Sequence, residues 1–490
     1  MLMRVLLLAS FLVISATPAV VAQDASAVVA AASKAMGTDN LNAVASIGHA
    51  HIGAFGQSKS IGDPMGAVNV TSVPDYKRVI NFSKPNTMTA PVLRATGTSY
   101  PPIVTGASEP TPGPFSQTIT AEQAAASWGQ ALNIWATPWG FLKAAAANKA
   151  TASRQGNQQV VSFSPAGFTS PSGSSYTMTG YISNQNLVTK VEARVDHAVV
   201  GDLLVEFEYS GYQNMNGLQV PTRVVQRQAG LVTFDATIES ATANPPTLAE
   251  LLAPSPAGGA PAPAPVQSSA AAPPVERIGD GVFTIGGNYV SLAVDMGDHI
   301  LVVESGQSDA RGIAVMAAAR QAIPNKPIRF VVNSHAHFDH ASGLAAAVAE
   351  GATILTHRNN EQVLERLLSG SRSLVGDSLS KVTNRRTNVV EGVGDRDVRK
   401  GTNGKIVELH RIPNEHSDGM LAVLLPAEKV LWTADITVVN PTPVQLATLR
   451  AAVAAFNRLK LDYDTWIPAH PPSPDRPLTK AEVLAAAGTN

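Results

Sequence analysis

The sequence of 490 residues contains no cysteine. Disulfides, thiolate metal ligands and a lipid-modified cysteine are therefore excluded, and any metal site must use other side chains. A strong charge of one sign is also missing, because 36 Lys and Arg residues face 37 Asp and Glu residues, a formal net charge of −1. Nucleic acids and anionic membranes select basic surfaces. The sequence therefore predicts neither as a partner.

Apolar runs long enough to span a bilayer, about 20 residues, are absent beyond the N-terminus. At the N-terminus, Arg4 precedes a shorter apolar run, and Val20 and Ala22 supply small residues at positions −3 and −1 of a cleavage site. This pattern is typical of a secretory signal peptide. We therefore expect residues 1–22 to be removed, the mature chain to have no transmembrane segment, and the protein to be periplasmic or secreted.

Composition divides the mature chain into two domains. Residues 253–274, APSPAGGAPAPAPVQSSAAAPP, are rich in Pro and Ala and are expected to form a semi-extended linker. The linker separates an N-terminal domain, 23–252, from a C-terminal domain, 275–490. Such a linker predicts that each domain folds separately. The N-terminal domain is then expected to shape access to a substrate without supplying metal ligands.

The N-terminal domain shows the pattern of antiparallel strands. Residues 175–240 alternate apolar and polar side chains, and the turn clusters SNQN, VVGD, QNMNG and QAG divide them at hairpin spacing. Helices are expected at 25–37, 120–133 and 137–149. A curved antiparallel sheet with a few helices fits this pattern. In topology it resembles the half-barrel of bacterial lipoprotein-carrier proteins.

The C-terminal domain alternates strand and helix patterns. Strands in two groups, each followed by helices, predict two sheets packed face to face with helices outside, a four-layer αββα sandwich within an α+β chain. Strands are expected at 281–287, 289–297, 299–306, 328–334, 352–357, 405–412, 420–426, 429–436 and 465–470, and helices at 308–323, 342–351, 359–370 and 442–460.

Histidines are concentrated in one stretch of this domain, NSHAHFDHASG, although the whole chain has only 11 of them. The stretch follows the predicted strand 328–334, where a loop can turn several side chains toward one point. Imidazoles and carboxylates are the ligands that Zn²⁺ prefers where thiolates are absent. Further candidates follow three later strands. The candidate metal ligands are His335, His337, Asp339, His340, His416, Asp435 and His470.

This order of residues resembles the metallo-β-lactamase superfamily, whose motif His-x-His-x-Asp-His is followed by single His, Asp and His ligands. The resemblance covers about residues 275–475. It implies two Zn²⁺ ions, with other divalent metals as alternatives. By position, one ion would be held by His335, His337 and His416 and the other by Asp339, His340 and His470, with Asp435 bridging both.

The resemblance implies an enzyme, a metal-dependent hydrolase. Two divalent ions ~3.5–4 Å apart lower the pKa of a shared water and present hydroxide as the nucleophile. Asp339 is the expected catalytic carboxylate, which orients that hydroxide and accepts a proton. Asp435 differs from the β-lactamase subclass with Cys at this position and matches the glyoxalase II, lactonase and phosphodiesterase branches.

The sequence therefore predicts an exported dinuclear zinc hydrolase that cleaves an ester, lactone, amide or β-lactam bond in a small-molecule substrate. Two alternatives stay open. One is a phosphodiesterase or nuclease on the same scaffold. The other is a carrier of an apolar ligand with an appended hydrolase domain. A homo-oligomer is also left open.

The remaining histidines have structural interpretations. His49 and His51 would share one face of a strand, which leaves a metal pair as an alternative, and His357 is expected to be structural. Glu304 stands where the family commonly has an aspartate, so that position departs from the pattern. Solvated strand or turn positions are expected for His197, His299 and His410.

Overall fold

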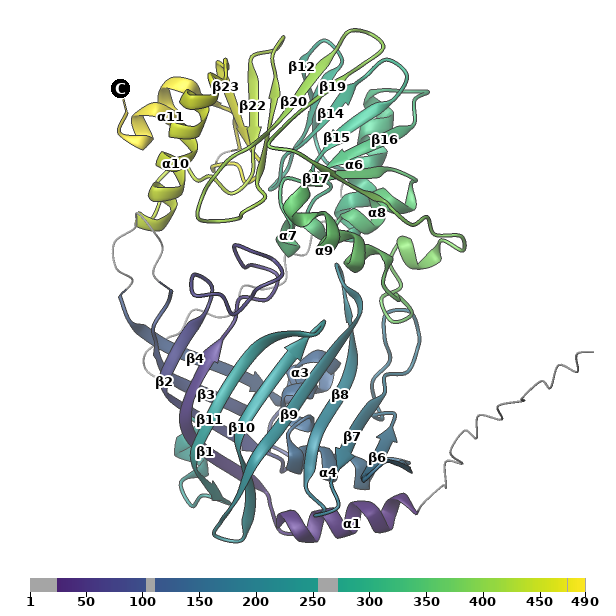
Figure 1. The fold of residues 1–490 in the computed structure, drawn as a ribbon, viewed down its shortest axis with the longest axis vertical. Coiled ribbons are helices and arrows are strands. Elements are labelled where there is room, and N and C mark those ends of the chain that lie inside the picture. Colours follow the sequence, from purple (N-terminus) through teal and green to yellow (C-terminus); the bar gives the residue numbers. More distant parts are fainter. Residues whose placement is uncertain (1–23, 103–110, 254–271, 474, 490) are drawn as a thin grey trace, which may run out of the picture.

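The computed structural model describes residues 24–102, 111–253, 272–473 and 475–489. The predicted signal peptide and most of the predicted linker lie outside these residues. Figure 1 shows two strand-rich parts, one built from the N-terminal half of the chain and one from the C-terminal half. The structure is α+β, as predicted. Over the described ranges, no helix has the length and apolar character needed to cross a membrane.

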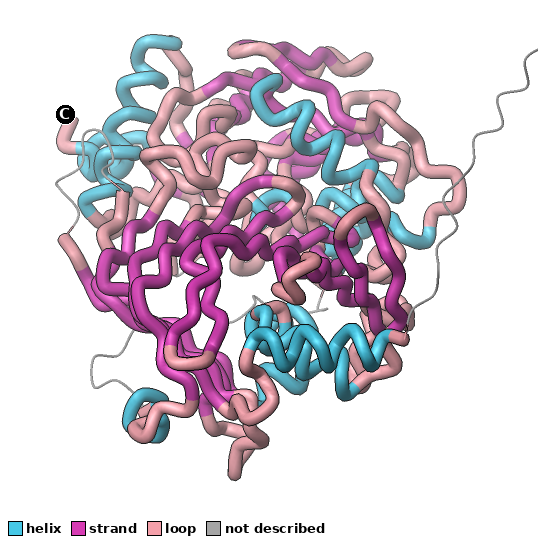
Figure 2. The backbone as a smooth tube through the Cα atoms, turned by 60° about the horizontal axis from the view of Figure 1, so that its bottom comes forward, coloured by secondary structure: helices cyan, strands magenta, loops and turns pink. Residues whose placement is uncertain are grey.

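One antiparallel sheet of eleven strands forms the N-terminal part, in the order β4-β3-β2-β1-β11-β10-β9-β8-β7-β6-β5. The sheet curves around a group of helices (Figure 2), and the prediction of an antiparallel, strand-rich N-terminal part is confirmed. Its strands are β1 (Ala43–Ile52), β2 (Thr71–Asn81), β3 (Pro91–Ser99), β4 (Gly113–Thr120), β5 (Thr151–Gln155), β6 (Gln158–Phe163), β7 (Met178–Ile182), β8 (Val188–His197), β9 (Gly201–Met215), β10 (Leu218–Gln228) and β11 (Leu231–Ala243).

The four turn clusters identified in the sequence lie at the junctions between consecutive strands from β7 to β11, and three of them overlap the strand ends. In the β9–β10 turn, Asn216 and Gly217 have φ of 55° and 87°. A two-residue hairpin turn needs positive φ at both positions, which Asn-Gly tolerates best. Local turn chemistry therefore sets the register of these hairpins.

Helices of the N-terminal part lie against the sheet and end at identifiable residues. The single helix expected at 120–133 is instead two helices, because Ser127 adopts an extended conformation (φ −134°, ψ 121°) and its side chain accepts a hydrogen bond from the Gln130 amide. Serine at such a position favours the start of a new helix. The helices are α1 (Ala25–Met36), α2 (Ala121–Ala126), α3 (Trp128–Trp135), α4 (Pro138–Ala147) and α5 (Leu248–Leu252).

Two mixed sheets form the C-terminal part, one of seven strands from β12 to β18 and one of six strands from β19 to β24, each in sequence order. β15 to β18 run parallel, as do β22 and β23. The strands are β12 (Val275–Gly279), β13 (Val282–Ile285), β14 (Ser291–Asp295), β15 (Ile300–Val303), β16 (Ile328–Val332), β17 (Thr353–His357), β18 (Val390–Val393), β19 (Arg396–Lys400), β20 (Ile406–Arg411), β21 (Leu421–Leu425), β22 (Val430–Thr433), β23 (Thr465–Pro468) and β24 (Leu478–Thr479).

A buried apolar cluster draws side chains from both of these sheets, among them Leu292, Val303, Leu409 and Trp432. Helices α6, α8 and α9 pack on strands of the seven-stranded sheet. Helices α10 and α11 pack on the six-stranded sheet, at the other side of this part in Figure 1. The helices are α6 (Asp309–Ala322), α7 (Phe338–Ala341), α8 (Leu344–Ala349), α9 (Arg358–Ser369), α10 (Pro443–Leu459) and α11 (Lys480–Ala487), with a 3₁₀ turn at Leu379–Lys381.

The two parts touch at the turn between β8 and β9. The buried carboxylate of Asp202 accepts hydrogen bonds from the Ser371 hydroxyl (2.6 Å) and the Ser373 amide (2.9 Å). Arg372 donates to the main-chain oxygen of Val199 (3.0 Å). One apolar cluster continues from the N-terminal sheet to α6, α8 and α9. The contact joins the two parts more closely than a proline-rich linker predicts.

Candidate metal centre

The histidine-rich loop begins where β16 ends and continues into α7. β16 is apolar, and its last two residues are buried, so the loop starts from inside the protein. The Asn333 side chain donates to the main-chain oxygen of His340 (3.2 Å), which draws the two ends of the loop together. His335, His337 and His340 are at most 1% exposed. The loop therefore turns three imidazoles into the interior.

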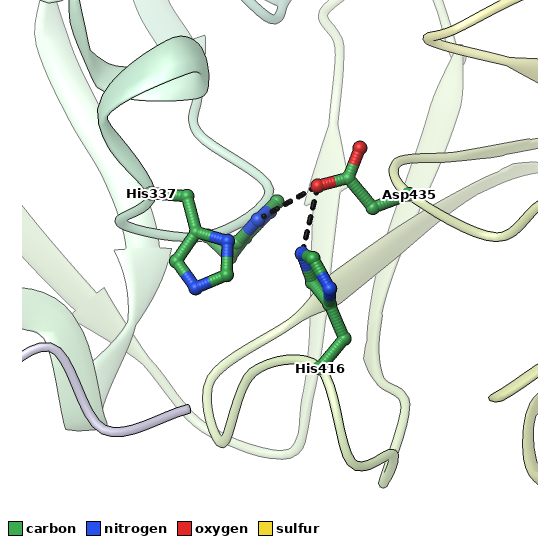
Figure 3. Close-up of side chains that lie close together, drawn as sticks. His337, His416 and Asp435 are labelled. Atoms are coloured by element: carbon green, nitrogen blue, oxygen red, sulfur yellow. Dashed lines mark ion pairs between the residues drawn. The ribbon is translucent and has the colours of Figure 1, made fainter. Parts of the chain in front are cut away.

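Three more predicted ligands reach the same point from the six-stranded sheet, where His416 follows β20, Asp435 follows β22 and His470 follows β23. The carboxylate of Asp435 lies at the centre. Its Oδ2 is 2.8 Å from His416 Nε2 and 3.1 Å from His340 Nε2, and its Oδ1 is 2.9 Å from His470 Nε2. Figure 3 shows His337 and His416 beside this carboxylate.

All seven candidates are brought together in two groups that could each hold a metal ion. Within each group the ligand atoms lie within 4.8 Å of one another, and Asp435 belongs to both groups. The grouping has the same division that the family resemblance implies. One group contains His335, His337, His416 and Asp435, and the other contains Asp339, His340, His470 and Asp435.

Buried imidazole nitrogens that make no hydrogen bond indicate that the candidate ligands could bind a metal ion. Among the described residues, His337 Nδ1 is buried without a hydrogen-bond partner, and His335 Nε2 and His416 Nε2 lie 3.2 and 2.8 Å from Asp435 Oδ2 without hydrogen-bond geometry. Buried polar atoms in native proteins nearly always have a partner. All three nitrogens belong to one ligand group, and a divalent cation such as Zn²⁺ accepts coordination from neutral imidazoles of this kind.

The protonation state of His335 and His337 also suits a metal. Burial, followed by the neighbouring imidazoles of His340 and His337, holds the pKa of His335 well below its ordinary value. Burial, together with the charge of His416, lowers the pKa of His337 to about 4. Both rings are therefore neutral near pH 7, and a neutral imidazole is the form that binds a metal.

His340 is oriented from behind by two residues that lie outside the metal motif. Its Nδ1 is 2.6 Å from the hydroxyl of Tyr289, and that hydroxyl donates to Glu304 Oε2 (3.0 Å). A proton on Nδ1 leaves the lone pair of Nε2, which lies 3.1 Å from Asp435 Oδ2, available to a metal ion. Metal-binding histidines commonly have such a partner on the other ring nitrogen.

Glu304 takes the place of the family's common aspartate and still reaches the site. The residue is fully buried, and its Oε1 accepts a hydrogen bond from the Ser334 amide (2.5 Å) at the start of the loop. Its backbone has φ of 63°, in the left-handed region. The comparison with the family motif had singled out Glu304, because the family commonly has an aspartate at this position. No motif includes Tyr289, so its role was not predicted from the sequence.

A cavity of about 510 Å³ opens beside the two ligand groups. Its walls mix polar and apolar side chains, and they come from both parts of the chain. Besides four of the candidate ligands, the lining includes Gln57, Lys59 and Asn69 from the N-terminal part and Ile436, Val444 and Gln445 from the C-terminal part. A small molecule placed here would contact both parts.

The alternative of a metal pair at His49 and His51 finds no support, because neither belongs to a potential metal group among the described residues. His49 lies 3.3 Å from Glu239, and His51 lies 3.1 Å from the hydroxyl of Ser72. His357 has the expected structural role, since its Nδ1 accepts from the Asn359 amide at the start of α9.

The expectation that His299 and His410 are solvated was wrong. Both are buried, at 8% and 3% exposure. Each pairs with a nearby carboxylate, Asp298 and Glu408 respectively. The ring of Phe330 packs edge-on against His299 at 5.5 Å. His197 is half-buried at the contact between the two parts.

Residues 284–470 match the family model described as the metallo-beta-lactamase superfamily. A curated relative, the 2,4-dinitroanisole O-demethylase subunit alpha of Nocardioides sp. (strain JS1661), is 25% identical over 201 residues, which are 40% of this chain and 55% of the relative. The chain thus spans about half the length of that relative. The family match confirms the predicted resemblance for the C-terminal part and supports the enzyme class, a metal-dependent hydrolase.

Solved structures with a related fold include the metallo-beta-lactamase FIM-1 of Pseudomonas aeruginosa in a mono-zinc form, with a TM-score of 0.34, 17% identity, and coverage of 44% of this chain and 94% of that chain. The sec-alkylsulfatase Pisa1 of Pseudomonas sp. gives a TM-score of 0.32 and 16% identity, over 44% of this chain and 41% of that chain. These likenesses are too distant for an inference about activity. The predicted similarity of the N-terminal part to lipoprotein-carrier half-barrels stays a prediction.

Proposed function

We propose, from the place of residues 284–470 in the metallo-β-lactamase superfamily, that the chain is an exported dinuclear zinc hydrolase. One observation carries the proposal. Two groups of ligand atoms share Asp435, and in one group the buried His337 Nδ1 has no hydrogen-bond partner among the described residues. Two ions, rather than one, are proposed because the groups together offer seven side chains, whereas one zinc needs three or four protein ligands.

The roles of the ligands follow from this grouping. Bound divalent ions would activate a water and polarise the bond to be cleaved. Asp435, between the two groups, would offset the repulsion between two dications. Asp339 is the proposed catalytic residue, because its carboxylate is partly exposed and lines the cavity, where it can orient a water and accept a proton.

The proposed substrate is a small molecule with an ester, lactone, amide or β-lactam bond. The cavity volume of about 510 Å³ suits a molecule of this size. The lining offers polar groups such as Gln57, Asn69 and Gln445 for orientation and apolar side chains such as Val444 for contact. Zinc is the proposed metal because the ligands are imidazoles and carboxylates without a thiolate.

The proposed organisation supports this activity. Helices on the outer faces of the two C-terminal sheets support a four-layer αββα sandwich over 275–490. Residues 23–252 would form the accessory domain and residues 253–274 the linker. Residues 1–22 would be a signal peptide that directs the chain to the periplasm or out of the cell.

The test combines metal analysis with a substrate panel. The full chain, purified without added chelator, should contain about two zinc-type ions per chain by elemental analysis. Nitrocefin, acyl lactones, thioesters and bis-p-nitrophenyl phosphate then separate the proposed hydrolase from a phosphodiesterase. Absence of metal above background would refute the proposal, and turnover of the phosphodiester alone would assign the alternative.

A second candidate function, the binding of an apolar ligand, is favoured by a different observation. A cavity of about 650 Å³ in the N-terminal part is lined mainly by apolar side chains, including Phe82, Trp128, Trp135 and Phe168. A fluorescent fatty acid should bind the full chain, and Ala144→Trp should reduce that binding by narrowing the cavity. The exposed Ala27→Trp serves as the control. No saturable binding to the wild-type chain would remove this candidate.

A further inference from the structure

The loop between β1 and β2, residues 53–70, leaves the middle of the N-terminal sheet and reaches the histidine-rich loop of the C-terminal part. In Figure 1 this loop rises toward α7. Its main chain contacts three points around the candidate metal centre. Gly56 O accepts from the Phe338 amide (3.0 Å), Ser58 O lies 3.0 Å from His337 Nε2, and Lys59 O accepts from the Asp418 amide (2.9 Å).

Ser58 determines which nitrogen of His337 can face a metal. A carbonyl oxygen can only accept, so the 3.0 Å contact requires a proton on His337 Nε2. The Nδ1 atom is then unprotonated. It is also one of the buried nitrogens without a hydrogen-bond partner among the described residues. The N-terminal part therefore selects the tautomer of a ligand in the first group.

Gln57 acts on the second group. Its side-chain amide Nε2 donates to Asp339 Oδ1 (2.8 Å). The other oxygen, Oδ2, lies 3.5 Å from His340 Nε2 and 3.7 Å from His470 Nε2. A carboxylate held at one oxygen cannot rotate freely about χ2, so the hydrogen bond keeps Oδ2 directed at the ligand group. Each group thus receives one contact from the same short segment.

Packing holds the segment in register with the centre. Gly56 has φ of 76°, and a Cβ atom there would lie 2.1 Å from a ring carbon of Phe338. The ring of Phe55 packs edge-on against Phe338 at 5.1 Å. Lys59 forms an ion pair with Glu415 (2.8 Å), next to His416. Close approach of main chain to ring therefore requires glycine at position 56.

We propose that the N-terminal segment 55–59 completes the metal centre and that Gln57 is a positioning residue for Asp339. The inference rests on the proposed zinc centre and concerns only its support from the N-terminal part. Partners behind a ligand commonly change metal affinity 10–100-fold when they are removed. The loss of Gln57 should therefore weaken the second ion selectively, because its side-chain amide donates to Asp339, a ligand of the second group.

The experiment measures metal affinity in the full chain. Wild type, Gln57→Ala and Gln57→Glu are loaded with Co²⁺ and titrated with a chromophoric chelator, while the cobalt absorption spectrum reports the ligand field. Gln57→Glu keeps the size of the side chain but replaces the donor with a carboxylate. Gln155→Ala, an exposed glutamine on β5, is the matched control.

Wild type and Gln155→Ala should each release two ions, and each ion should leave the control at about the same chelator concentration as it leaves wild type. Both Gln57 variants should release one ion about 10–100-fold more readily, with a changed spectrum for that ion and a lower kcat. Gly56→Ala should weaken both ions, since the displaced Phe338 lies between His337 and Asp339. Unchanged affinity for both ions in both Gln57 variants would overturn this inference and leave the zinc centre standing. A wild-type chain without metal would instead overturn the proposed function itself.

Discussion

At the scale of single residues, Asp435 combines an unusual backbone conformation with a place in both ligand groups. Its φ of 44° lies in the left-handed region, which few residues other than glycine occupy. Such strain costs on the order of 1–3 kcal/mol and persists only where the surroundings enforce it. The structure places this conformation where one carboxylate meets imidazoles from both ligand groups. The strained backbone at Asp435 therefore coincides with the position that both ligand groups share.

Asp435→Ala should remove the residue that both groups share. We expect the metal content to fall from about two ions to fewer than one per chain, and the rate to fall by at least about two orders of magnitude, as for loss of a group needed in the transition state. Elemental analysis measures the metal content, and kcat on the best substrate of the panel measures the rate. The comparison variant Asp339→Asn should lower kcat with a smaller loss of metal than Asp435→Ala. Full metal content in Asp435→Ala would rule out the bridging role.

Tyr289→Phe tests the support behind His340. Removal of the hydroxyl leaves His340 Nδ1 without its 2.6 Å partner, and we expect metal affinity to fall about 10–100-fold. Competition with a chelator measures the change. Tyr463→Phe is the matched control, because Tyr463 is equally buried but packs among aromatic rings away from the centre. Equal affinities in the two variants would contradict a role for Tyr289.

The candidate ligands that the structure brings together could be predicted from the sequence, whereas the residues that support them could not. His335, His337, Asp339 and His340 lie within six positions, and their spacing is a signal in itself. Tyr289 lies 51 positions from His340, and only the pairing of strands brings the two together. Residues that act through long-range contacts carry no local pattern to read.

At the scale of elements, strands with clear alternation or continuous apolar runs were predicted within a residue or two at most ends. Strand β16, expected at 328–334, spans Ile328–Val332. The strands missed in the C-terminal part, β12, β18, β19 and β24, are short and lie at sheet edges. β19, with the sequence RDVRK, is largely polar and owes its strand conformation to pairing with β20. Pairing partners therefore determine such strands more than their own side chains do.

His197 ends strand β8 at the contact between the two parts, where its ring packs against Phe338 at 4.8 Å. Burial, followed by the charge of Arg372, lowers its pKa from 6.5 to about 4. In the unfolded chain the ring takes up a proton near pH 6.5. Its neutral form therefore contributes fully to stability above pH 6.5, and the contribution is lost as the pH falls toward 4.

His197→Asn should remove this pH dependence, because Asn keeps an acceptor for the Val199 and Val200 amides but does not titrate. We expect the melting temperature of wild type to fall more than that of His197→Asn between pH 7 and pH 5. His51→Asn, an exposed histidine on β1, is the control and should follow wild type. Parallel curves for wild type and His197→Asn would contradict the assignment.

At the scale of the whole molecule, the contact between the parts changes what the linker implied. A proline-rich linker predicts independent domains, and composition alone could not reveal that Asp202 binds the loop after α9. Burial disfavours the charged form, yet hydrogen bonds from Ser371, Leu374 and Ser373 hold the pKa of Asp202 below its ordinary value. The contact between the two parts therefore contains a buried carboxylate, that of Asp202, whose charge is stabilised by hydrogen bonds.

Asp202→Ala should weaken that interface. Hydrogen bonds to a charged group contribute about 1.5–3 kcal/mol each, so we expect a loss of at least about 2 kcal/mol in the free energy of unfolding. Calorimetry should show one transition for wild type and two separated transitions for the variant. Asp280→Ala, whose side chain is 96% exposed, should change stability by less than about 0.5 kcal/mol. Two transitions already present in wild type would contradict a cooperative interface.

The order of strands in the large sheet has a kinetic consequence for the centre. β1 lies between β2 and β11, and the Asn42 amide binds Asn244 across 202 positions of sequence. Loops of that length close slowly, so sheets rich in such pairings are slow to form. Segment 55–59, which supports His337 and Asp339, directly follows β1. We expect it to reach its native position only after β1 has paired with β11. Metal uptake should thus be a late event in refolding, lagging behind secondary structure, and zinc added at the outset should not speed the first phase.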